Sequence, residues 1–170
     1  CHAQAVRLTS LLHDISMLNK LDESSDSFEM VEINITEVVE GVKQDVSLAL
    51  EEKNMHIEAE LPKELIIKGN TLQIYSIFRN LIDNSILHAG VGTTVFIECY
   101  RTDSEYIYLS VADNGVGVES KHLNKIFDRF YRVDKGRSRK LGGTGLGLSI
   151  VKNSIQFHQG RISAKNRKGG

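Results

Sequence analysis

The chain has 170 residues, of which 41% are hydrophobic and 25% are charged, proportions typical of a globular protein with one sizeable core. Its formal net charge of −1 gives no support to broad attraction toward nucleic acids or membranes. Two cysteines, Cys1 and Cys99, are too few for a disulfide framework or a metal site of known spacing, so we expect a cytosolic protein.

The first segment, residues 3–21, has apolar residues three and four positions apart and predicts an amphipathic helix that packs on other helices. His13 lies within it beside Asp14, and we interpret it as a packed or solvated histidine rather than a catalytic one. The polar run that follows predicts a linker over residues 23–27 and a separate domain over residues 28–170. Neither a membrane-spanning run nor a signal peptide is expected.

The remaining pattern mixes helices and strands without strict alternation. We therefore expect an α+β fold, a two-layer sandwich with one mixed, mostly antiparallel sheet covered by about three helices. Thr36 and Asn70 are the expected caps of the first two helices of this domain. The expected strands are residues 28–35, 55–61, 65–68, 94–101, 106–112 and 161–164. The expected helices are residues 36–53, residues 71–89 and a glycine-led helix that ends at about residue 157.

The helix expected over residues 71–89 carries polar residues on its apolar face. Asn80 and Asn84 are four residues apart, which places both amides on one stripe, with His88 one turn further along. Amides among apolar residues need hydrogen-bonding partners, and asparagine oxygens suit a hard cation such as Mg²⁺. The stripe indicates a ligand site, and two asparagines on a half-exposed helix are the alternative.

A short loop, residues 113–117, follows one of the expected strands. It places the Asp113 carboxylate at the strand end, with the flexible backbone of Gly115 and Gly117 behind it. A carboxylate can accept a hydrogen bond from the exocyclic amine of adenine, and the glycines let a base lie against the main chain. An Asp-Asn-Gly turn without a ligand is the alternative.

Positive charge gathers after the aromatic segment at residues 126–132. Basic residues stand at positions 135, 137, 139 and 140. We interpret this connector as one that closes over a triphosphate, with each charged hydrogen bond contributing about 1.5 to 3 kcal/mol. A solvated basic loop is the alternative.

A glycine-dense hinge at residues 142–148 runs directly into the last expected helix. A helix that begins there points unpaired N–H groups outward and forms an anion site, most plausibly for phosphate. A P-loop would need Lys and then Ser or Thr where Leu148 and Ser149 stand, and a Rossmann loop would need glycine at Leu148. Taken alone, the hinge fits a phosphate cradle and a structural turn equally well.

In this order, the four segments resemble the nucleotide-binding boxes of sensor histidine kinases, which belong to the GHKL superfamily of ATPases and kinases. Residues 80–84 resemble the N box, residues 113–117 the first glycine box, residues 127–130 the F box and residues 143–147 the second glycine box. The similarity extends over about residues 28–170. The N-terminal helix is similar to the end of the second helix of the family's dimerisation domain.

The resemblance implies a Bergerat-type sandwich that binds ATP with Mg²⁺ between the N-box helix and a flexible lid. It implies that Asn84 holds Mg²⁺, that Asp113 binds the adenine amine and that Arg132 reaches the phosphates. Asn80, Asn84 and Arg132 are the expected catalytic residues. Asn80 is also an expected ATP contact. The remaining expected ATP contacts are His88, Gly115, Gly117, Phe130, Gly143, Thr144, Gly145, Leu146 and Gly147.

The sequence departs from the family pattern in three ways. Leu87 stands where the N box usually has Lys or Arg, so one phosphate contact is absent or comes from the lid. No segment resembles the phosphoacceptor box, because His13 is in the wrong helix for it. The chain also stops at Gly170, before the last strand of such domains, and we expect it to be a piece of a longer protein.

The type of residue at position 80 distinguishes ATP hydrolysis from phosphoryl transfer to a protein side chain. Relatives that hydrolyse ATP carry a glutamate where this chain has Asn80, and an amide has no useful basicity. The resemblance therefore implies γ-phosphoryl transfer to a histidine on a dimerisation helix, then to an aspartate on a response-regulator receiver domain. It also implies a homodimer and a cytoplasmic domain of a membrane-anchored sensor, without a nucleic-acid partner.

Three other functions fit parts of the pattern. The first is ATP hydrolysis coupled to conformational change, against which Asn80 argues. The second is a degenerate module that binds nucleotide or a partner without catalysis, which only Leu87 supports. The third is an anti-sigma type of serine kinase, and the dimerisation-like helix and the long basic connector favour a histidine kinase over it.

Overall fold

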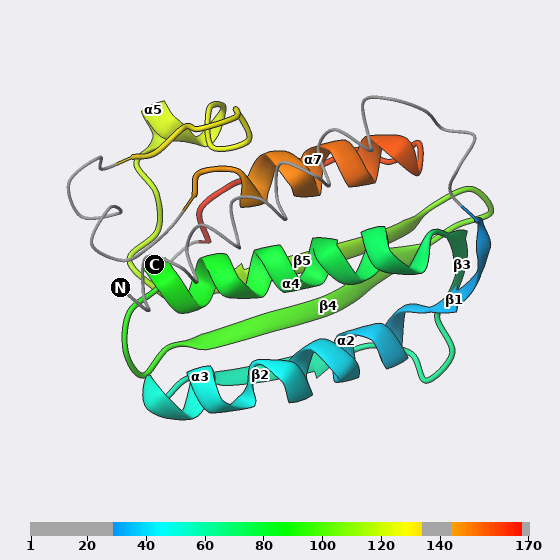
Figure 1. Cartoon of the computed structure of the whole chain (residues 1–170), viewed down its shortest axis with the longest axis horizontal. Coiled ribbons are helices and arrows are strands. Elements are labelled where there is room, and N and C mark those ends of the chain that lie inside the picture. The colour runs from blue at the N-terminus through cyan, green and yellow to red at the C-terminus, as the bar shows by residue number, and fades with distance from the viewer. Residues whose placement is uncertain (1–28, 134–143, 168–170) are drawn as a thin grey trace, which may run out of the picture.

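The computed structural model describes residues 29–133 and 144–167 (Figure 1). The expected N-terminal helix with His13 and the expected linker lie outside the described residues. The elements are β1 (Val31–Asn34), α2 (Ile35–Asp45), α3 (Ser47–Glu52), β2 (His56–Glu60), β3 (Ile66–Gly69), α4 (Thr71–His88), β4 (Thr94–Thr102), β5 (Ile107–Asp113), α5 (Ser120–Leu123) and α7 (Gly147–Phe157).

The strands of the described chain form two sheets. β1 and β3 pair antiparallel, with Val31 opposite Gly69 and Asn34 opposite Ile66. The second sheet has the order β2-β4-β5, in which β2 is parallel to β4 and β4 is antiparallel to β5. The structure thus divides the single sheet expected from the sequence in two. The reason is that β1 and β3 are only four residues long and run almost directly into helices.

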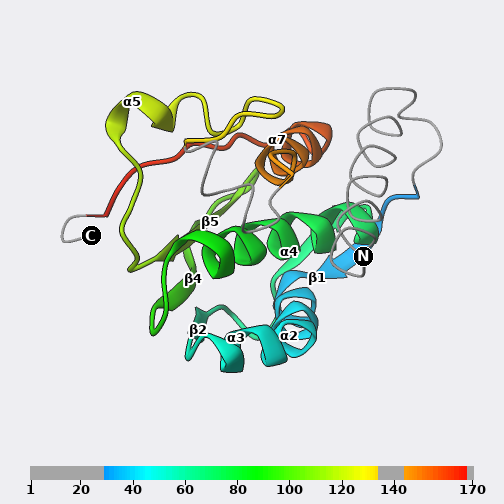
Figure 2. The ribbon, with the colours of Figure 1, turned by 60° about the vertical axis from the view of Figure 1, so that its left-hand side comes forward.

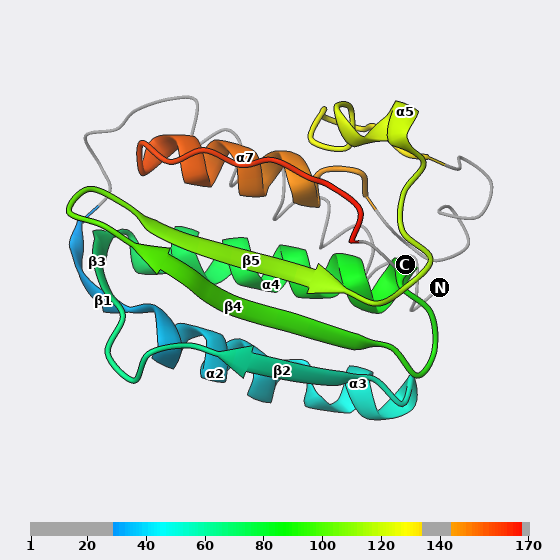
Figure 3. The ribbon, with the colours of Figure 1, turned by 180° about the vertical axis from the view of Figure 1, so that it is seen from behind.

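Helices α2, α4 and α7 lie on one side of the strands, and α4 runs between the other two (Figure 2, Figure 3). The core forms where α2 and α4 meet β4. Val39, Val42, Ile82, Val95 and Ile97 are each no more than 1% exposed. Full burial of one such side chain contributes about 1.5 to 3 kcal/mol. The α+β class and the two-layer sandwich with three main helices are therefore confirmed.

The N-terminus of α4 is also the place where α7 ends. Asn70 caps α4 as the sequence predicts, because its side-chain oxygen accepts a hydrogen bond from the Gln73 N–H at 3.1 Å. The Asn70 N–H donates to Nε2 of His158 at 3.0 Å, and Nδ1 of His158 lies 2.7 Å from the Ser154 carbonyl oxygen. Because Nε2 accepts, Nδ1 carries the proton and donates. His158 thus fastens the end of α7 to the start of α4.

The helix expected over residues 36–53 is two helices in the structure. The backbone leaves helical geometry at Val46 (φ −100°, ψ 2°), whose side chain is buried, so tertiary packing overrides the continuous helical pattern. The cap is Asn34 rather than Thr36. The side-chain oxygen of Asn34 accepts from the Thr36 N–H at 3.2 Å, whereas the Thr36 hydroxyl donates to the Pro62 carbonyl at 2.6 Å.

The strand expected over residues 161–164 is wrong, because residues 161–167 have no strand pairing. Side chains hold this segment instead. Asn166 accepts from the Val118 N–H at 3.0 Å and donates to the Val118 carbonyl at 2.6 Å. The Arg167 guanidinium lies 4.6 Å from the centre of the Phe96 ring. The segment is therefore attached both to the loop after β5 and to the sheet.

Candidate functional site

The polar stripe of α4 meets the beginning of α7 at Asn80. The Asn80 side-chain N–H group donates to the carbonyl oxygen of Ser76 at 2.9 Å and to its hydroxyl at 3.1 Å. Its side-chain oxygen lies 2.8 Å from the point that a Cβ on Gly147 would occupy. A larger residue at position 147 would collide with that oxygen. The N box and the second glycine box are therefore in direct contact.

The end of β5 is held against the last turns of α4. Oδ2 of Asp113 accepts a hydrogen bond from the Ser85 hydroxyl at 2.9 Å, and Oδ1 accepts from the Gly115 N–H at 3.0 Å. A Cβ on Gly115 would lie 2.5 Å from both Cα and the carbonyl oxygen of Ala89. The first glycine box therefore needs glycine at position 115 because the α4 backbone is so close.

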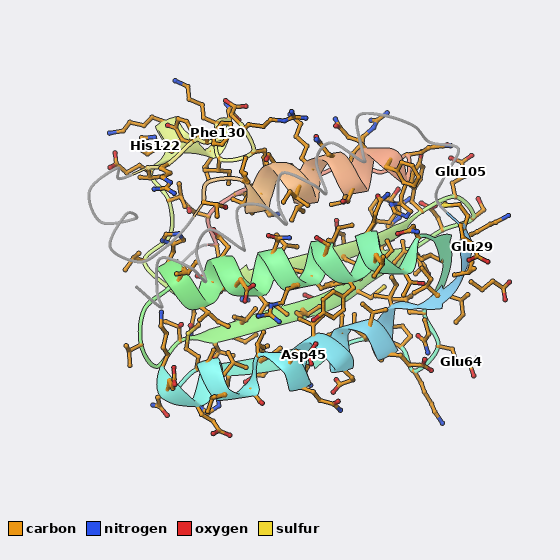
Figure 4. All side chains as sticks on the ribbon, viewed as in Figure 1. Glu29, Asp45, Glu64, Glu105, His122 and Phe130 are labelled. Atoms are coloured by element: carbon orange, nitrogen blue, oxygen red, sulfur yellow. The ribbon has the colours of Figure 1, made fainter. Side chains whose placement is uncertain are left out.

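The F box adjoins the second glycine box. The Phe130 N–H donates to the Gly145 carbonyl at 2.9 Å, and a Cβ on Gly145 would lie 3.2 Å from Cα of Phe130 and 3.3 Å from Nε of Arg132. Phe130 has a φ of 63°, a left-handed conformation that a bulky residue rarely adopts, and its side chain is 66% exposed. Figure 4 shows Phe130 near His122, on the segment beside α7.

The beginning of α7 presents backbone donors. The Leu146 N–H donates to the Thr144 hydroxyl oxygen at 3.2 Å, and the Leu146 side chain is fully buried together with Ile150. No side chain caps this helix end among the described contacts. The N–H groups of the first turn, which starts at Gly147, and the positive end of the helix dipole together suit a phosphate.

Charged groups meet at the C-terminal end of α4. Lys53 donates from Nζ to the carbonyl oxygen of Ile86, which places a positive charge at the negative end of the helix dipole. Partial desolvation of the ring, followed by the positive charges of Lys53 and Arg132, lowers the pKa of His88. The Asp113 carboxylate acts in the opposite direction. Three of the predicted site residues, His88, Asp113 and Arg132, therefore share one electrostatic environment.

For the other predicted site residues, the structure gives mainly their position and their exposure. Asn84 is half-buried on α4, and its side-chain amide has no hydrogen-bonding partner in the described part of the chain. Gly117, with a φ of 69°, is exposed on the same loop as Asp113. Leu87 is half-buried beside the stripe. Gly143 and the basic residues at positions 135, 137, 139 and 140 lie outside the described residues.

Sequence reasoning missed two residues that the structure brings to the site, Ser85 and Lys53. The bond from Ser85 to Asp113 joins residues 28 positions apart, and that from Lys53 to Ile86 joins residues 33 positions apart. The spacing within one helix predicts neither contact. The one signal for Ser85 is a small polar residue directly after Asn84 on a largely apolar helix.

Comparisons with known proteins show the family to which the chain belongs. A family model described as histidine kinase-, DNA gyrase B- and HSP90-like ATPase matches residues 69–170. Sensor histidine kinase WalK of Bacillus subtilis is 35% identical over 167 residues, which cover 96% of this chain and 27% of WalK. The phosphate regulon sensor protein PhoR of Haemophilus influenzae is 36% identical over 156 residues, which cover 91% of this chain and 36% of PhoR.

A solved structure of full-length ShkA in complex with AMPPNP aligns with a TM-score of 0.78 at 23% sequence identity. The alignment covers 94% of this chain and 33% of ShkA, and it shows a likeness of fold.

The matched family model spans more than half of the chain and includes all four boxes. The chain therefore belongs to the family of histidine kinase-, DNA gyrase B- and HSP90-like ATPases. Membership in this family and the similarity to sensor histidine kinases together identify the chain as the catalytic, ATP-binding domain of a sensor histidine kinase. It spans only about a quarter to a third of the length of those relatives. Within residues 29–133 and 144–167, no helix combines the length and apolar character needed to cross a bilayer.

Proposed function

We propose that this chain binds ATP together with Mg²⁺ and transfers the γ-phosphoryl group to a histidine on a separate dimerisation helix. The phosphoryl group then passes to an aspartate on the receiver domain of a response regulator. Membership in an ATPase family supports the nucleotide, and similarity to WalK and PhoR supports the phosphotransfer.

The observation that carries this proposal is the series of contacts that links the four separate segments along the second half of α4. Asn80 contacts Gly147, and Ser85 binds Asp113. The backbone of Phe130 is hydrogen-bonded to Gly145. A base bound at Asp113 and a phosphate tail at the start of α7 would thus be held by parts of one site.

The amide of Asn84 suits the metal in this proposal. Its side chain is half-buried and unpartnered in the described chain, and an amide oxygen is a hard donor that Mg²⁺ accepts. When bound, Mg²⁺ neutralises charge on the phosphate oxygens. Asn84 would hold the metal together with those oxygens.

Arg132 is our candidate for the positive charge that Leu87 does not supply. Its Nε lies beside Gly145, 3.3 Å from the point that a Cβ there would occupy. That position is next to the helix end proposed to bind phosphate. In this proposal Arg132 contacts the phosphates, and Gly143, Gly145 and Gly147 surround the phosphate tail.

The proposed reaction is a displacement at phosphorus. An imidazole nitrogen of the acceptor histidine attacks the γ-phosphorus, the bond to the bridging oxygen of ADP breaks, and the imidazole proton goes to solvent. Asn80 positions groups in the site and does not deprotonate a water molecule, because an amide is not a useful base. Catalysis then depends on positioning and charge stabilisation.

In the whole protein we propose a homodimer formed through the dimerisation helices, with this domain on the cytoplasmic side of a membrane-anchored sensor. The support is the similarity, over 96% and 91% of this chain, to two sensor kinases of which the chain spans only 27% and 36%. Size measurement and membrane fractionation of the whole protein test these two statements.

Calorimetry of ADP and ATP binding to the 170-residue chain, with and without Mg²⁺, tests the proposal. Asp113→Ala should remove binding, and Asn84→Ala should remove its dependence on Mg²⁺. Glu105→Ala is the matched control, because this exposed carboxylate lies at the far end of the β4–β5 pair (Figure 4). The control should bind as the wild type does.

Radiolabelled ATP and a separately produced dimerisation domain of the same protein then test the transfer. We expect an acid-labile phosphohistidine on that domain. A folded wild-type chain that binds no nucleotide would refute the proposal. Rapid phosphate release without an acceptor would instead favour an ATPase, the alternative against which Asn80 argues.

A further inference from the structure

We infer that Ser85 is a positioning residue that acts through Asp113 to make the site selective for a base with an exocyclic amine. The inference rests on the proposed function, in which Asp113 receives the base. It concerns a side chain on α4 that lies outside the stripe formed by Asn80, Asn84 and His88.

The contact joins a buried hydroxyl to a half-buried carboxylate. The Ser85 hydroxyl donates to Oδ2 of Asp113 at 2.9 Å, and Ser85 is only 5% exposed. A buried hydroxyl needs a partner, because leaving it unpaired is costly. The carboxylate is the partner that the structure provides. The bond therefore fixes one carboxylate oxygen relative to α4.

The second oxygen of Asp113 is fixed from the other side. Oδ1 accepts from the Gly115 N–H at 3.0 Å, so each oxygen has one protein donor. An ionised carboxylate offers about four lone-pair sites, and two of them are thus occupied. The two donors set the plane of the carboxylate and leave the other lone pairs for a ligand donor.

The same side of α4 also holds the loop. Ala89 is one turn after Ser85, and its N–H donates to the Ser85 carbonyl at 2.8 Å. Ala89 packs against Gly115 so closely that a Cβ there would lie 2.5 Å from its backbone. Ser85 and Ala89 therefore form one surface, and the direction of the Asp113 carboxylate is tied to the helix.

This arrangement favours one type of base. A fixed hydrogen-bond acceptor binds a ligand amine favourably and a ligand carbonyl oxygen unfavourably, since two acceptors cannot share a hydrogen bond. A site built for a particular hydrogen bond discriminates strongly because its polar group is otherwise left unpaired. If the carboxylate were free to rotate, water could satisfy it in other orientations. We therefore expect Ser85 to increase the preference for an amine.

The test compares ADP with IDP, which carries a carbonyl oxygen where ADP has the amine. Both are measured by calorimetry with Mg²⁺ on the 170-residue chain. For Ser85→Ala we expect ADP binding to weaken about tenfold and IDP binding to change less than about twofold. The ratio of the two dissociation constants should shrink by about fivefold or more.

Two further variants separate positioning from general structural damage. Ser85→Thr keeps the hydroxyl and should keep the ratio within about twofold of wild type. Ser110→Ala removes a half-buried serine from β5, three residues before Asp113, and should change neither constant. Circular dichroism and thermal unfolding confirm that each variant is folded.

The inference is overturned if Ser85→Ala leaves the ratio unchanged, whether both nucleotides bind as before or both are weakened equally. Failure of the proposed function has a different signature. In that case the wild type binds no ADP, or Asp113→Ala binds it as well as the wild type does. Loss of binding in Asp113→Ala together with an unchanged Ser85→Ala ratio would refute this inference alone.

Discussion

Replacing Gly115 with alanine tests the close approach of the β5 loop to α4. The added Cβ would lie 2.5 Å from Cα and the carbonyl oxygen of Ala89 and 2.7 Å from its Cβ. Two of these atoms are backbone atoms of a helix end, which cannot rotate away as the tip of a side chain can. The loop itself has to move, and with it Asp113.

The expected cost follows from the kind of atoms involved. Overpacking a well-packed site typically costs about 1 to 3 kcal/mol, and contact with backbone on one side leads us to expect about 2 kcal/mol. For a chain of this length, 1 kcal/mol shifts the melting temperature by about 2 to 4 °C. Gly115→Ala should therefore melt about 4 to 8 °C lower. It should also bind ADP more weakly, because the Asp113 carboxylate is displaced from Ser85.

Thermal unfolding followed by circular dichroism measures the stability, and calorimetry measures ADP binding. Gly41→Ala is the matched control. Gly41 lies within α2, and a Cβ there meets no atom within 4 Å. Alanine is favoured over glycine in a helix interior by about 0.5 to 1 kcal/mol, so this variant should melt higher and bind ADP normally.

The steric argument predicts opposite signs for the same chemical change at two positions. If Gly115→Ala melts at or above the wild-type temperature and binds ADP unchanged, the loop does not pack against α4 as described. A uniform decrease in both variants would also contradict the reasoning, because it would show that the effect of alanine does not depend on the neighbouring atoms.

Three other predictions follow from single contacts. Gly147→Ala should leave stability nearly unchanged, because the Asn80 side chain, whose oxygen lies 2.8 Å from the added Cβ, can rotate aside. The same rotation should weaken ADP binding in calorimetry. A loss of stability with normal binding would contradict this. Asn70→Ala should destabilise the chain by about 1 kcal/mol in urea unfolding through loss of the α4 cap, and an unchanged midpoint would argue against the cap. The lowered pKa of His88 means that the unfolded chain takes up the proton first as the pH falls below about 6.5, so stability should decrease toward pH 5. His88→Gln should reduce that decrease in unfolding experiments across the pH range, and an identical pH profile would refute the assignment.

Sequence patterns predicted the features that depend on short-range spacing. Asn70 caps α4 as expected, since a cap needs only a side-chain acceptor and an N–H group three residues later. The four-residue spacing of Asn80 and Asn84 correctly placed a polar stripe along the helix. The mixture of helical and strand patterns without strict alternation was enough to predict the α+β sandwich.

Features that depend on distant partners could not be predicted in this way. Thr36 and Asn34 are both good capping residues, and the choice falls on Asn34 because the Thr36 hydroxyl binds Pro62, 26 positions away. The break at Val46 comes from burial of its side chain. The partnership of Ser85 with Asp113 depends on how β5 lies against α4, which no local pattern specifies.

The attachment of α7 to α4 at both ends limits how α7 can respond to a phosphate at its beginning. Sliding of α7 along α4 would separate His158 from Asn70 and Gly147 from Asn80 at the same time. The far end of α7 also abuts β3, because the His158 ring lies 3.0 Å from the point that a Cβ on Gly69 would occupy. Since β3 pairs with β1, α7 rigidly connects the helix end that we propose to bind phosphate with the first strand of the described chain.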